Sequence, residues 1–431
     1  MKTTQGGISG VDNFYGLIRL QMLAITAAAL LLAGPARAQK QYDPGASDTE
    51  IRIGNVSPYT GWAQDYGAVG KAEAAYFRMV NERGGVNGRR IEFHSEDMAV
   101  SAGGGTAEAT KRSEELTRKL VEKDGVLLMF SSFGTEANLA VRDYLNRAKV
   151  PQLFVQSSAA AFDDAGHFPW TMGFFATFKM EGAAYAKYIL QNKPAAKIAL
   201  WYADDETGRE YLAGVREGLG AKNAGLIVKE IAYHPEALRG DFPLGPTIAA
   251  QIAELQGSGA DVFLNLSVGR YTTAAIRAAY DLGWRPLQFI PNASLSIAAF
   301  LDPAGLQKAI GIISNARSKG WLRPGTQKDP AVGEFLEWMK KFNFEASLRD
   351  QNNVAGYERA QVLVEVLRRC GDDLTRGNVM KQAAGLDMEL GMLRPGIRVK
   401  TSATDYQPIS QLYLVKFDGT DWAAIGAIET K

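Results

Sequence analysis

Residues Gly125–Phe162 read GVLLMFSSFGTEANLAVRDYLNRAKVPQLFVQSSAAAF and contain two predicted strands around one predicted helix. The apolar run Val126–Phe130 is typical of a buried strand, and a helix is predicted to begin at Thr135. The second predicted strand covers Gln152–Val155. Strands that alternate with helices at this spacing indicate a parallel sheet in an α/β fold.

Polar turns follow both of these strands. The first turn holds Ser132 and Phe133 ahead of the helix at Thr135, and the second holds Ser157 and Ser158. Ligands of open parallel sheets bind at the carboxyl ends of the strands, where a helix N-terminus offers unpaired N–H groups and a positive dipole end. The two turns therefore predict a cradle for a carboxylate. The alternative for Ser132 and Thr135 is that they only cap the helix.

The alternation of strands and helices continues along most of the chain and restarts at a predicted helix over Met180–Asn192. We therefore expect two α/β lobes, each with a doubly wound parallel sheet, rather than one long sheet. Asp418-Gly419 is predicted to be the turn of a terminal hairpin. The predicted strands are 51–56, 90–97, 126–130, 152–155, 197–202, 226–233, 262–266, 287–290 and 309–313, and the further predicted helices are 66–83, 106–123, one ending near 219, 248–256, 272–282, 330–342 and 353–369.

The N-terminus has the pattern of a secretory signal peptide, residues 1–38. Leu17–Gly34 is apolar with Arg19 near its start, and Ala36-Arg37-Ala38 follows as a small-x-small cleavage site. A membrane anchor is the alternative, but the uninterrupted apolar part, Met22–Ala33, is too short to span a bilayer. We therefore expect export to the periplasm and cleavage near Ala38.

The composition is that of an ordinary globular protein. The chain has 431 residues, 46% hydrophobic and 22% charged, which is enough for two or three domain-sized cores. The formal net charge is +1, and removing residues 1–38 takes away three basic residues and one acidic residue to leave −1. A protein with almost no net charge lacks the excess of basic residues that is typical of proteins that bind nucleic acid or anionic lipid. The single cysteine, Cys370, cannot form an internal disulfide, which fits a bacterial periplasm.

Catalytic and cofactor motifs are incomplete in this sequence. His94, His167 and His234 lack partners at metal-ligand spacing, and no G-x-S-x-G motif occurs. The run 67–72, GAVGKA, lacks both the first glycine and the final Ser or Thr of a phosphate-binding loop. The acidic run 204–206 is either a catalytic cluster or negative charge at a helix N-terminus. We expect no metal, no cofactor and no enzymatic activity, with a secreted hydrolase as the alternative.

Several motifs, in their order along the chain, resemble those of one known family. They are IRIGNVSPYTGWAQDYG at 51–67, NERGGVNGRRIEF at 81–93, SSFGT at 131–135, VPQLFVQSSA at 150–159 and DDETGREY at 204–211. The set resembles the periplasmic solute-binding proteins of ABC transporters, in the leucine/isoleucine/valine-binding (branched-chain amino acid) group with the type I periplasmic binding fold. The resemblance extends from about Glu50 to the terminal hairpin.

This resemblance implies two doubly wound parallel-sheet lobes joined by a three-crossing hinge, in the Venus-flytrap arrangement. The first lobe would hold 49–174 and 314–390, and the second 175–313 and 391–431. A small carboxylate-bearing solute would bind between the lobes of a monomer, and a permease in the inner membrane would recognise the closed form. A periplasmic ligand sensor that feeds a signalling receptor is the alternative on the same fold.

The resemblance also implies ligand-binding roles for particular residues. It places the carboxylate cradle on Ser132, Ser158 and Ala160, the wall of the cleft on Tyr66, and a contact from the second lobe on Thr207. Packing alone is the alternative for the aromatic residues. The full predicted set is Trp62, Tyr66, Ser132, Phe133, Thr135, Ser157, Ser158, Ala160, Phe178, Thr207 and Asn292.

Departures from the family pattern concern the charge of the ligand. Amino-acid binders of this group usually have a threonine where Ala160 stands, an acidic residue near Asn292, and often Asp where Phe178 stands. They also often carry a disulfide near this site, where the aligned residue here is Ser131. A buried ammonium without a counter-charge is costly. We therefore predict that the ligand is an aromatic or hydrophobic carboxylate rather than an amino acid.

Overall fold

The computed structural model describes residues 1–2, 40–98, 106–235 and 246–428. The chain divides into two compact units, Met1–Gln41 and Tyr42–Lys431, and the fold described below is that of the second unit. The predicted signal peptide, residues 1–38, lies outside the described residues apart from its first two.

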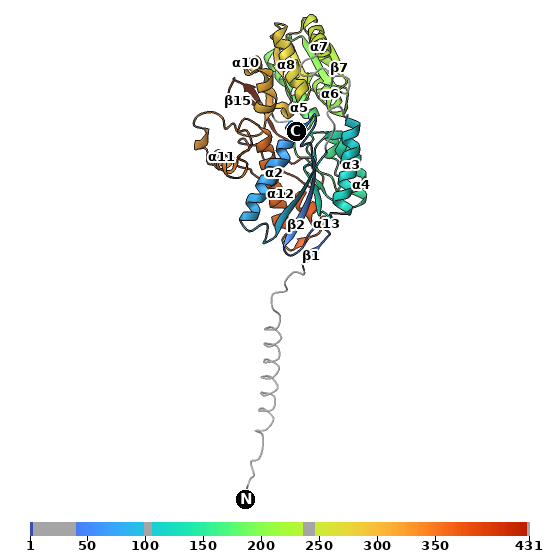
Figure 1. Ribbon diagram of the computed structural model, residues 1–431, viewed down its shortest axis with the longest axis vertical. Helices are drawn as coiled ribbons and strands as arrows, with labels where there is room; N and C mark the ends of the chain where they lie inside the picture. Colours follow the sequence, from blue (N-terminus) through green and yellow to red (C-terminus); the bar gives the residue numbers. More distant parts are fainter. Residues whose placement is uncertain (3–39, 99–105, 236–245, 429–431) are drawn as a thin grey trace. The chain divides into compact units, whose positions relative to one another are not determined.

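The first lobe is built on a parallel sheet of four strands in the order β3-β2-β4-β5. Figure 1 labels β2 of this sheet and the helices α2, α3 and α4 of the same lobe. The residues of β4 are buried throughout, as expected for a parallel sheet whose two faces are both covered by helices. Helix α2 packs on β2 and β3, and α3 packs on α4. These elements are β2 (Glu50–Ser57), β3 (Arg90–Asp97), β4 (Leu128–Phe130), β5 (Gln152–Leu153), α2 (Gly67–Glu82), α3 (Thr106–Glu122) and α4 (Thr135–Arg147).

The second lobe is built on a sheet of seven strands in the order β15-β14-β10-β9-β8-β6-β7. Strands β6 to β10 are parallel, and the terminal hairpin β14–β15 adds an antiparallel edge, as predicted. Its elements are β6 (Ile198–Ala203), β7 (Ile227–Tyr233), β8 (Val262–Leu266), β9 (Leu287–Phe289), β10 (Ile313–Ala316), β14 (Leu412–Phe417), β15 (Trp422–Ile428), α5 (Phe178–Asn192), α6 (Glu206–Leu219), α7 (Pro246–Gly257) and α8 (Arg270–Asp281).

The chain crosses between the two sheets three times. It leaves the first sheet after β5, and it leaves the second after β10 to form α11 (Pro330–Phe342), α12 (Asn352–Cys370) and α13 (Arg376–Ala383). Helix α12 packs against α2, and the chain then returns to the second sheet at β14. The predicted fold class, two parallel-sheet lobes joined by three crossings, is confirmed.

The residue bounds of the lobes remain a prediction. Ala316 is the last residue of β10 in the second sheet, whereas Ile397 and Ile409 pack in the core of the first lobe. We therefore propose that the second and third crossings lie near 317 and 410, somewhat later in the chain than the family pattern implies.

The predicted strand at 309–313 is wrong in its position. Residues Leu306–Ala309 form the short helix α10, Ile310 is 58% exposed, and Gly311 has a left-handed φ of +91°. The strand begins only at Ile313, because the apolar residues before it lie in α10 and in the turn that follows α10. Other short elements were not predicted: β1 (Gln41–Tyr42), β11 (Asp373–Leu374), β12 (Asp387–Met388), β13 (Val399–Lys400), η1 (Gln64–Tyr66), η2 (Ala160–Phe162), η3 (Ala221–Leu226), η5 (Asn292–Ser294), η6 (Ile297–Leu301), α9 (Asp302–Ala304) and η7 (Thr326–Lys328).

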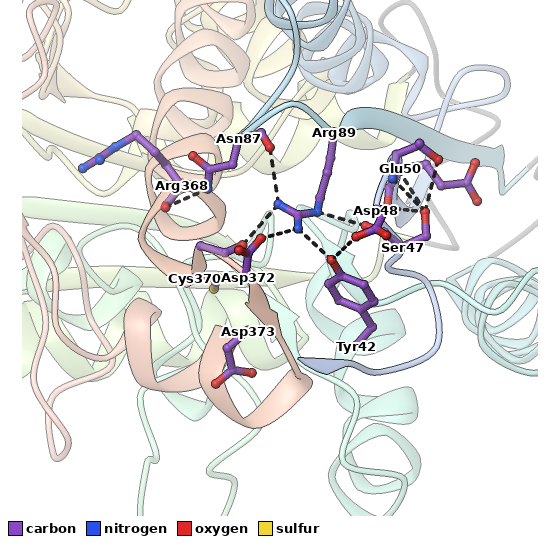
Figure 2. Close-up of polar contacts among 12 residues, drawn as sticks. Tyr42, Ser47, Asp48, Glu50, Asn87, Arg89, Arg368, Cys370, Asp372 and Asp373 are labelled. Atoms are coloured by element: carbon purple, nitrogen blue, oxygen red, sulfur yellow. Dashed lines mark hydrogen bonds and ion pairs between the residues drawn. The ribbon is translucent and has the colours of Figure 1, made fainter. Parts of the chain in front are cut away.

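The buried guanidinium of Arg89 joins three separate segments of the first lobe (Figure 2). It donates to the Ser47 carbonyl at 2.9 Å, to the Tyr42 hydroxyl at 2.8 Å and to the Asp372 carboxylate at 2.6 Å. These acceptors compensate for the removal of the charge from water. Arg89 precedes β3, so this cluster lies at the amino end of the strand and stabilises the lobe away from the carboxyl ends where ligands bind.

Candidate ligand-binding site

A cavity of about 240 Å³ lies between the two lobes. The segments that follow β4, β5, β6, β8 and β9 all border it, which places it at the carboxyl ends of parallel strands in both sheets. Its wall is rich in aromatic side chains, namely Trp62, Tyr66, Phe133, Phe175, Phe178, Tyr211, Tyr233, Tyr271, Trp321 and Trp422.

The structure brings most of the predicted ligand-binding residues to this one cavity. Ser132 and Ala160 do not border it. The roles of all these residues in binding remain predictions. The predicted residues that border the cavity are Trp62, Tyr66, Phe133, Thr135, Ser157, Ser158, Phe178, Thr207 and Asn292.

Three hydroxyl groups meet where the lobes face each other. The Thr135 hydroxyl lies 2.8 Å from that of Ser157 and 3.3 Å from that of Thr207, which belongs to α6 of the second lobe. Helix α4 begins after Gly134, which has a φ of +95°, and no side chain caps it. The alternative that Ser132 or Thr135 caps this helix is therefore wrong, and the Thr135 hydroxyl contacts Ser157 of its own lobe and Thr207 across the cleft.

Ser132 holds the strands of the first lobe together. Its hydroxyl oxygen accepts a hydrogen bond from the Val56 N–H at 3.2 Å, and its carbonyl accepts from the Asn138 side chain at 2.9 Å. The Gln156 N–H donates to the same carbonyl at 3.0 Å. These bonds join the ends of β2, β4 and β5.

The Ala160 N–H, predicted to bind the ligand carboxylate, binds a carboxylate of the protein itself. It donates to the two carboxylate oxygens of Glu210, on α6, at 2.9 and 3.1 Å. Burial raises the pKa of Glu210 to about 7, against the lowering effect of this backbone bond. The contact joins the segment after β5 to the second lobe.

Aromatic rings close the cleft from the first lobe. The Tyr66 ring stacks on Phe133, with 5.2 Å between centroids, and lies 5.4 Å from the ring of Phe300 in the second lobe. A Cβ added at Gly269, which has a φ of +63°, would lie 3.3 Å from the Tyr66 hydroxyl. Glycine at that position therefore lets Tyr66 approach the second lobe closely.

Comparison with known proteins gives the family. The family model described as "Periplasmic binding protein" matches residues 50–421. The chain belongs to the periplasmic binding protein family. The Leu/Ile/Val-binding protein homolog 8 of Brucella abortus (strain 2308) is 22% identical to it over 375 residues, which cover 82% of this chain and 85% of the relative.

Two solved structures show the same fold. A fatty acid ABC transporter substrate-binding protein from Thermomonospora curvata has a TM-score of 0.75 at 19% identity, covering 90% of this chain and 95% of that one. A solute-binding protein of an ABC transporter from Rhodopseudomonas palustris HaA2, in complex with p-hydroxybenzoic acid, has a TM-score of 0.71 at 16% identity, covering 89% and 98%.

In this periplasmic binding protein, an acidic residue does border the second-lobe side of the cavity. Glu181 of α5 accepts hydrogen bonds from the Tyr185 hydroxyl at 2.5 Å, the Tyr211 hydroxyl at 2.8 Å and the Asn292 N–H at 2.6 Å. The absence of the family's acids at Phe178 and near Asn292 therefore does not leave this half of the cleft without an acidic residue. Glu181 lies three positions after Phe178 on the same helix, so helical spacing was the signal that pointed to it.

Two acidic residues that border the cavity, Glu181 and Asp205, already accept hydrogen bonds from groups of the protein. Burial raises the pKa of Glu181 to about 7, so the carboxyl is substantially protonated at neutral pH. Asp205 also borders the cavity, but its carboxylate caps α6 by accepting the Gly208 N–H at 2.9 Å, and burial raises its pKa. Both acids are weaker partners for a ligand ammonium than a free carboxylate.

The described residues offer little support for a metal site, a reactive cysteine or a membrane span. In residues 40–98, 106–235 and 246–428, no three His, Cys, Asp or Glu side chains come together in a way that would hold a metal ion. Burial raises the pKa of Cys370 to about 12, which keeps the thiol protonated and unreactive. Among the helices of the described part of the chain, none combines the length and the apolar composition that a membrane span requires.

Proposed function

We propose that this periplasmic binding protein captures a small aromatic or hydrophobic carboxylic acid between its lobes and delivers it to the membrane permease of an ABC importer. The observation that carries the proposal is the aromatic-lined cavity of about 240 Å³ at the carboxyl ends of both sheets. The proposal includes export, with cleavage near Ala38, and action as a monomer in the periplasm. It rests on the chain's family and on the cavity's lining.

The lining of the cavity suits an acid with an apolar body. Trp62, Phe133 and Phe178 offer aromatic faces, on which a ring or an alkyl chain packs with favourable burial of apolar surface. Thr135 and Ser157 place hydroxyl groups on the same wall, where they can hydrogen-bond polar atoms of the solute. Two structures of the same fold concern acids of this chemistry, namely the fatty acid ABC transporter substrate-binding protein and the solute-binding protein in complex with p-hydroxybenzoic acid.

A branched-chain amino acid is the second candidate ligand. Glu181 and Asp205 border the cavity, and a curated relative carries the name of a Leu/Ile/Val-binding protein. We favour the acid without an ammonium group, because three protein donors already occupy the Glu181 carboxylate.

A thermal-shift screen of the mature protein tests the proposal. A ligand that binds only the folded chain raises its stability, by about 2.7 kcal/mol at a concentration a hundred times the Kd. We expect 4-hydroxybenzoate or octanoate to raise the melting temperature more than leucine or valine does. Stabilisation by leucine or valine, with no effect of either acid, would contradict the proposed ligand class.

A pair of tryptophan variants tests the location of the site. Trp62 borders the cavity, whereas Trp170 packs against the core of the first lobe, and both are half-buried. We expect Trp62→Ala to weaken binding of the stabilising acid by at least about tenfold, because it removes apolar contact worth roughly 1.5–3 kcal/mol. Trp170→Ala should leave the affinity within about twofold. Equal effects of the two substitutions in calorimetry would place the ligand elsewhere.

A further inference from the structure

A buried arginine, Arg359, borders the cavity from the first lobe. It lies on the face of α12 that also carries Asn352 and Ala355, at helical spacings of three and four residues. The side chain is 1% exposed, and the small Ala355 lies one turn before it on the same face. None of the predicted ligand-binding residues is basic, so Arg359 adds a charge that the sequence analysis did not foresee.

The Arg359 guanidinium has unmet hydrogen-bonding capacity. Its Nε and Nη1 atoms are shut off from solvent and have no hydrogen-bond partner among the described residues. The same holds for both carboxylate oxygens of Glu73, the acid on α2 whose charge acts on Arg359. Leaving a buried polar group without a partner costs roughly 1–3 kcal/mol, and more for a charged group. An unpartnered cation at the wall of a cavity therefore indicates a group that binds there.

Stacking on Phe175 fixes the position of this guanidinium. The Phe175 ring lies between two arginines, with its centroid 4.2 Å from the Arg359 guanidinium carbon and 3.8 Å from that of Arg317. Arg317 donates to the Glu358 carboxylate at 2.9 Å, so its charge is paired inside the protein. Phe175 itself borders the cavity. Of the two stacked arginines, Arg359 is therefore the one with hydrogen-bond donors to offer to a ligand.

Three charged groups act on Arg359, namely Glu73, Glu358 and Arg317, and the last two are hydrogen-bonded to each other. Burial raises the pKa of Glu73 and lowers that of Arg359, in each case against the attraction of the other's charge. The raised pKa of Glu73 favours its neutral form, whereas an arginine keeps its charge at neutral pH. An anion bound beside Arg359 would supply the missing negative charge.

We propose that Arg359 receives the carboxylate of the bound solute. The guanidinium keeps its positive charge and forms charge-assisted hydrogen bonds with a carboxylate, which makes it a specificity-determining group as well as a charge partner. The proposal rests on the proposed function and deepens it, because it places the carboxylate beside α12 rather than on the Ala160 N–H, which Glu210 occupies. It also predicts that the protein rejects the neutral amide of the same compound.

Calorimetry with matched acid and amide probes tests this assignment. For the mature wild-type protein at neutral pH, we expect 4-hydroxybenzoate to bind about 10–100-fold more tightly than 4-hydroxybenzamide, or octanoate than octanamide, as charge-assisted hydrogen bonds require. Arg359→Met should lose most of this preference and keep the affinity for the amide, and Arg359→Lys should restore part of it. Arg142→Met is the control, because Arg142 stacks on Phe168 and does not border the cavity.

A double variant keeps the test valid if the single one folds poorly. Glu73→Gln with Arg359→Met replaces both unpartnered ionisable groups by neutral side chains, and a cooperative thermal transition verifies its fold. A folded variant that retains the preference for the acid would overturn the role of Arg359 and leave the proposed function standing. A wild-type protein that binds neither acid nor amide of either pair would overturn the proposed function, and this assignment with it.

Discussion

The Glu181 carboxylate shows how one buried residue joins the second lobe to the wall of the site. It is 3% exposed and accepts from two tyrosine hydroxyls and from the Asn292 N–H, so it fixes the start of the short helix η5 beside the cavity. A carboxyl whose pKa is higher in the folded chain than in the unfolded chain stabilises the fold at low pH. This contribution is lost as the pH rises from about 4.3 through about 7.

We expect Glu181→Gln to become relatively more stable as the pH rises. The amide does not titrate, so its free energy of unfolding minus that of the wild type should increase from about pH 5 to about pH 8, by up to roughly 3 kcal/mol. Urea unfolding at several pH values measures the difference, in which the effects of all other titrating groups cancel. Glu217→Gln, an exposed replacement on α6, is the control. A difference that stays constant over this range would contradict the raised pKa.

At the residue scale, the sequence predicted the uncharged part of the site better than the charged part. Thr135 and Ser157, which border the cavity, were predicted because hydroxyl residues follow predicted strands, and Thr207 was predicted from the family resemblance; their roles in binding remain predictions. Glu181 lies one turn after the predicted Phe178 on α5, so helical spacing was a signal for it, whereas only the packing of α12 shows that Arg359 borders the cavity. A helical pattern does not say which of two buried faces meets a ligand.

Helices α5 and α6 approach each other closely along a line of glycines. A Cβ at Gly214 would lie 2.0 Å from the Lys179 carbonyl oxygen, and one at Gly182 would lie 2.5 Å from that of Tyr211. This close contact sets the position of α6, whose first turn carries Thr207 to the cavity. The two helices act together as the support for the second-lobe side of the site.

We expect Gly214→Ala to destabilise the protein by at least about 2 kcal/mol, because the added methyl group overpacks a backbone contact that cannot move freely. The helix propensity of alanine exceeds that of glycine by about 1 kcal/mol, which is too little to offset the clash. Gly377→Ala on α13 is the matched control, since nothing lies within 4 Å of its Cβ position. Its expected effect is a small gain in stability. Equal urea midpoints for the two variants would show that the helices can separate without cost.

At the element scale, long periodic segments were predicted well and short ones were not. Helix α11 has the predicted bounds, because apolar residues at helical spacing identify it. Strand β10 was placed too early, because an apolar run does not show where Gly311 turns the chain. Elements of two to five residues, such as β12 and η6, have too few residues to show a period.

The whole molecule has its two lobes joined by direct contacts beside the cleft. The loop after α11 meets η6 of the second lobe through a set of contacts that we call the latch, formed by Ile297, Ala298, Asp302, Arg349 and Gln351. The Gln351 side chain accepts the Ile297 N–H at 2.7 Å, and the Arg349 carbonyl accepts the Ala298 N–H at 2.9 Å. The Arg349 guanidinium and the Asp302 carboxylate are 2.9 Å apart.

We expect the double variant Arg349→Ala with Gln351→Ala to open the ligand-free protein. Removing contacts that exist only between the lobes favours the open state, and the ligand must then supply more of the free energy of closure. Small-angle scattering should show a larger radius of gyration without ligand, and calorimetry a severalfold weaker affinity. Arg216→Ala breaks an ion pair within the second lobe, with Glu230 at 2.9 Å, and should change neither. An unchanged radius for the double variant would mean that other contacts hold the lobes together.

At the scale of the whole molecule, the two lobes followed from the alternation of strands and helices that restarts in mid-chain, and the three crossings followed from the resemblance to a known family. The contacts that join the lobes did not, because residues such as Ala160 and Glu210 are 50 positions apart and meet only in this arrangement. A pattern along one segment carries no information about how two lobes face each other.

The most direct measurement of the central claim is a crystal structure of the mature protein grown with the acid that stabilises it most. We predict one molecule of that acid in the interlobe cavity, with its apolar body against Trp62 and Phe178 and its carboxylate on the Arg359 guanidinium. An acid bound outside the cavity, or a cavity closed by its own side chains in the liganded crystal, would contradict the account.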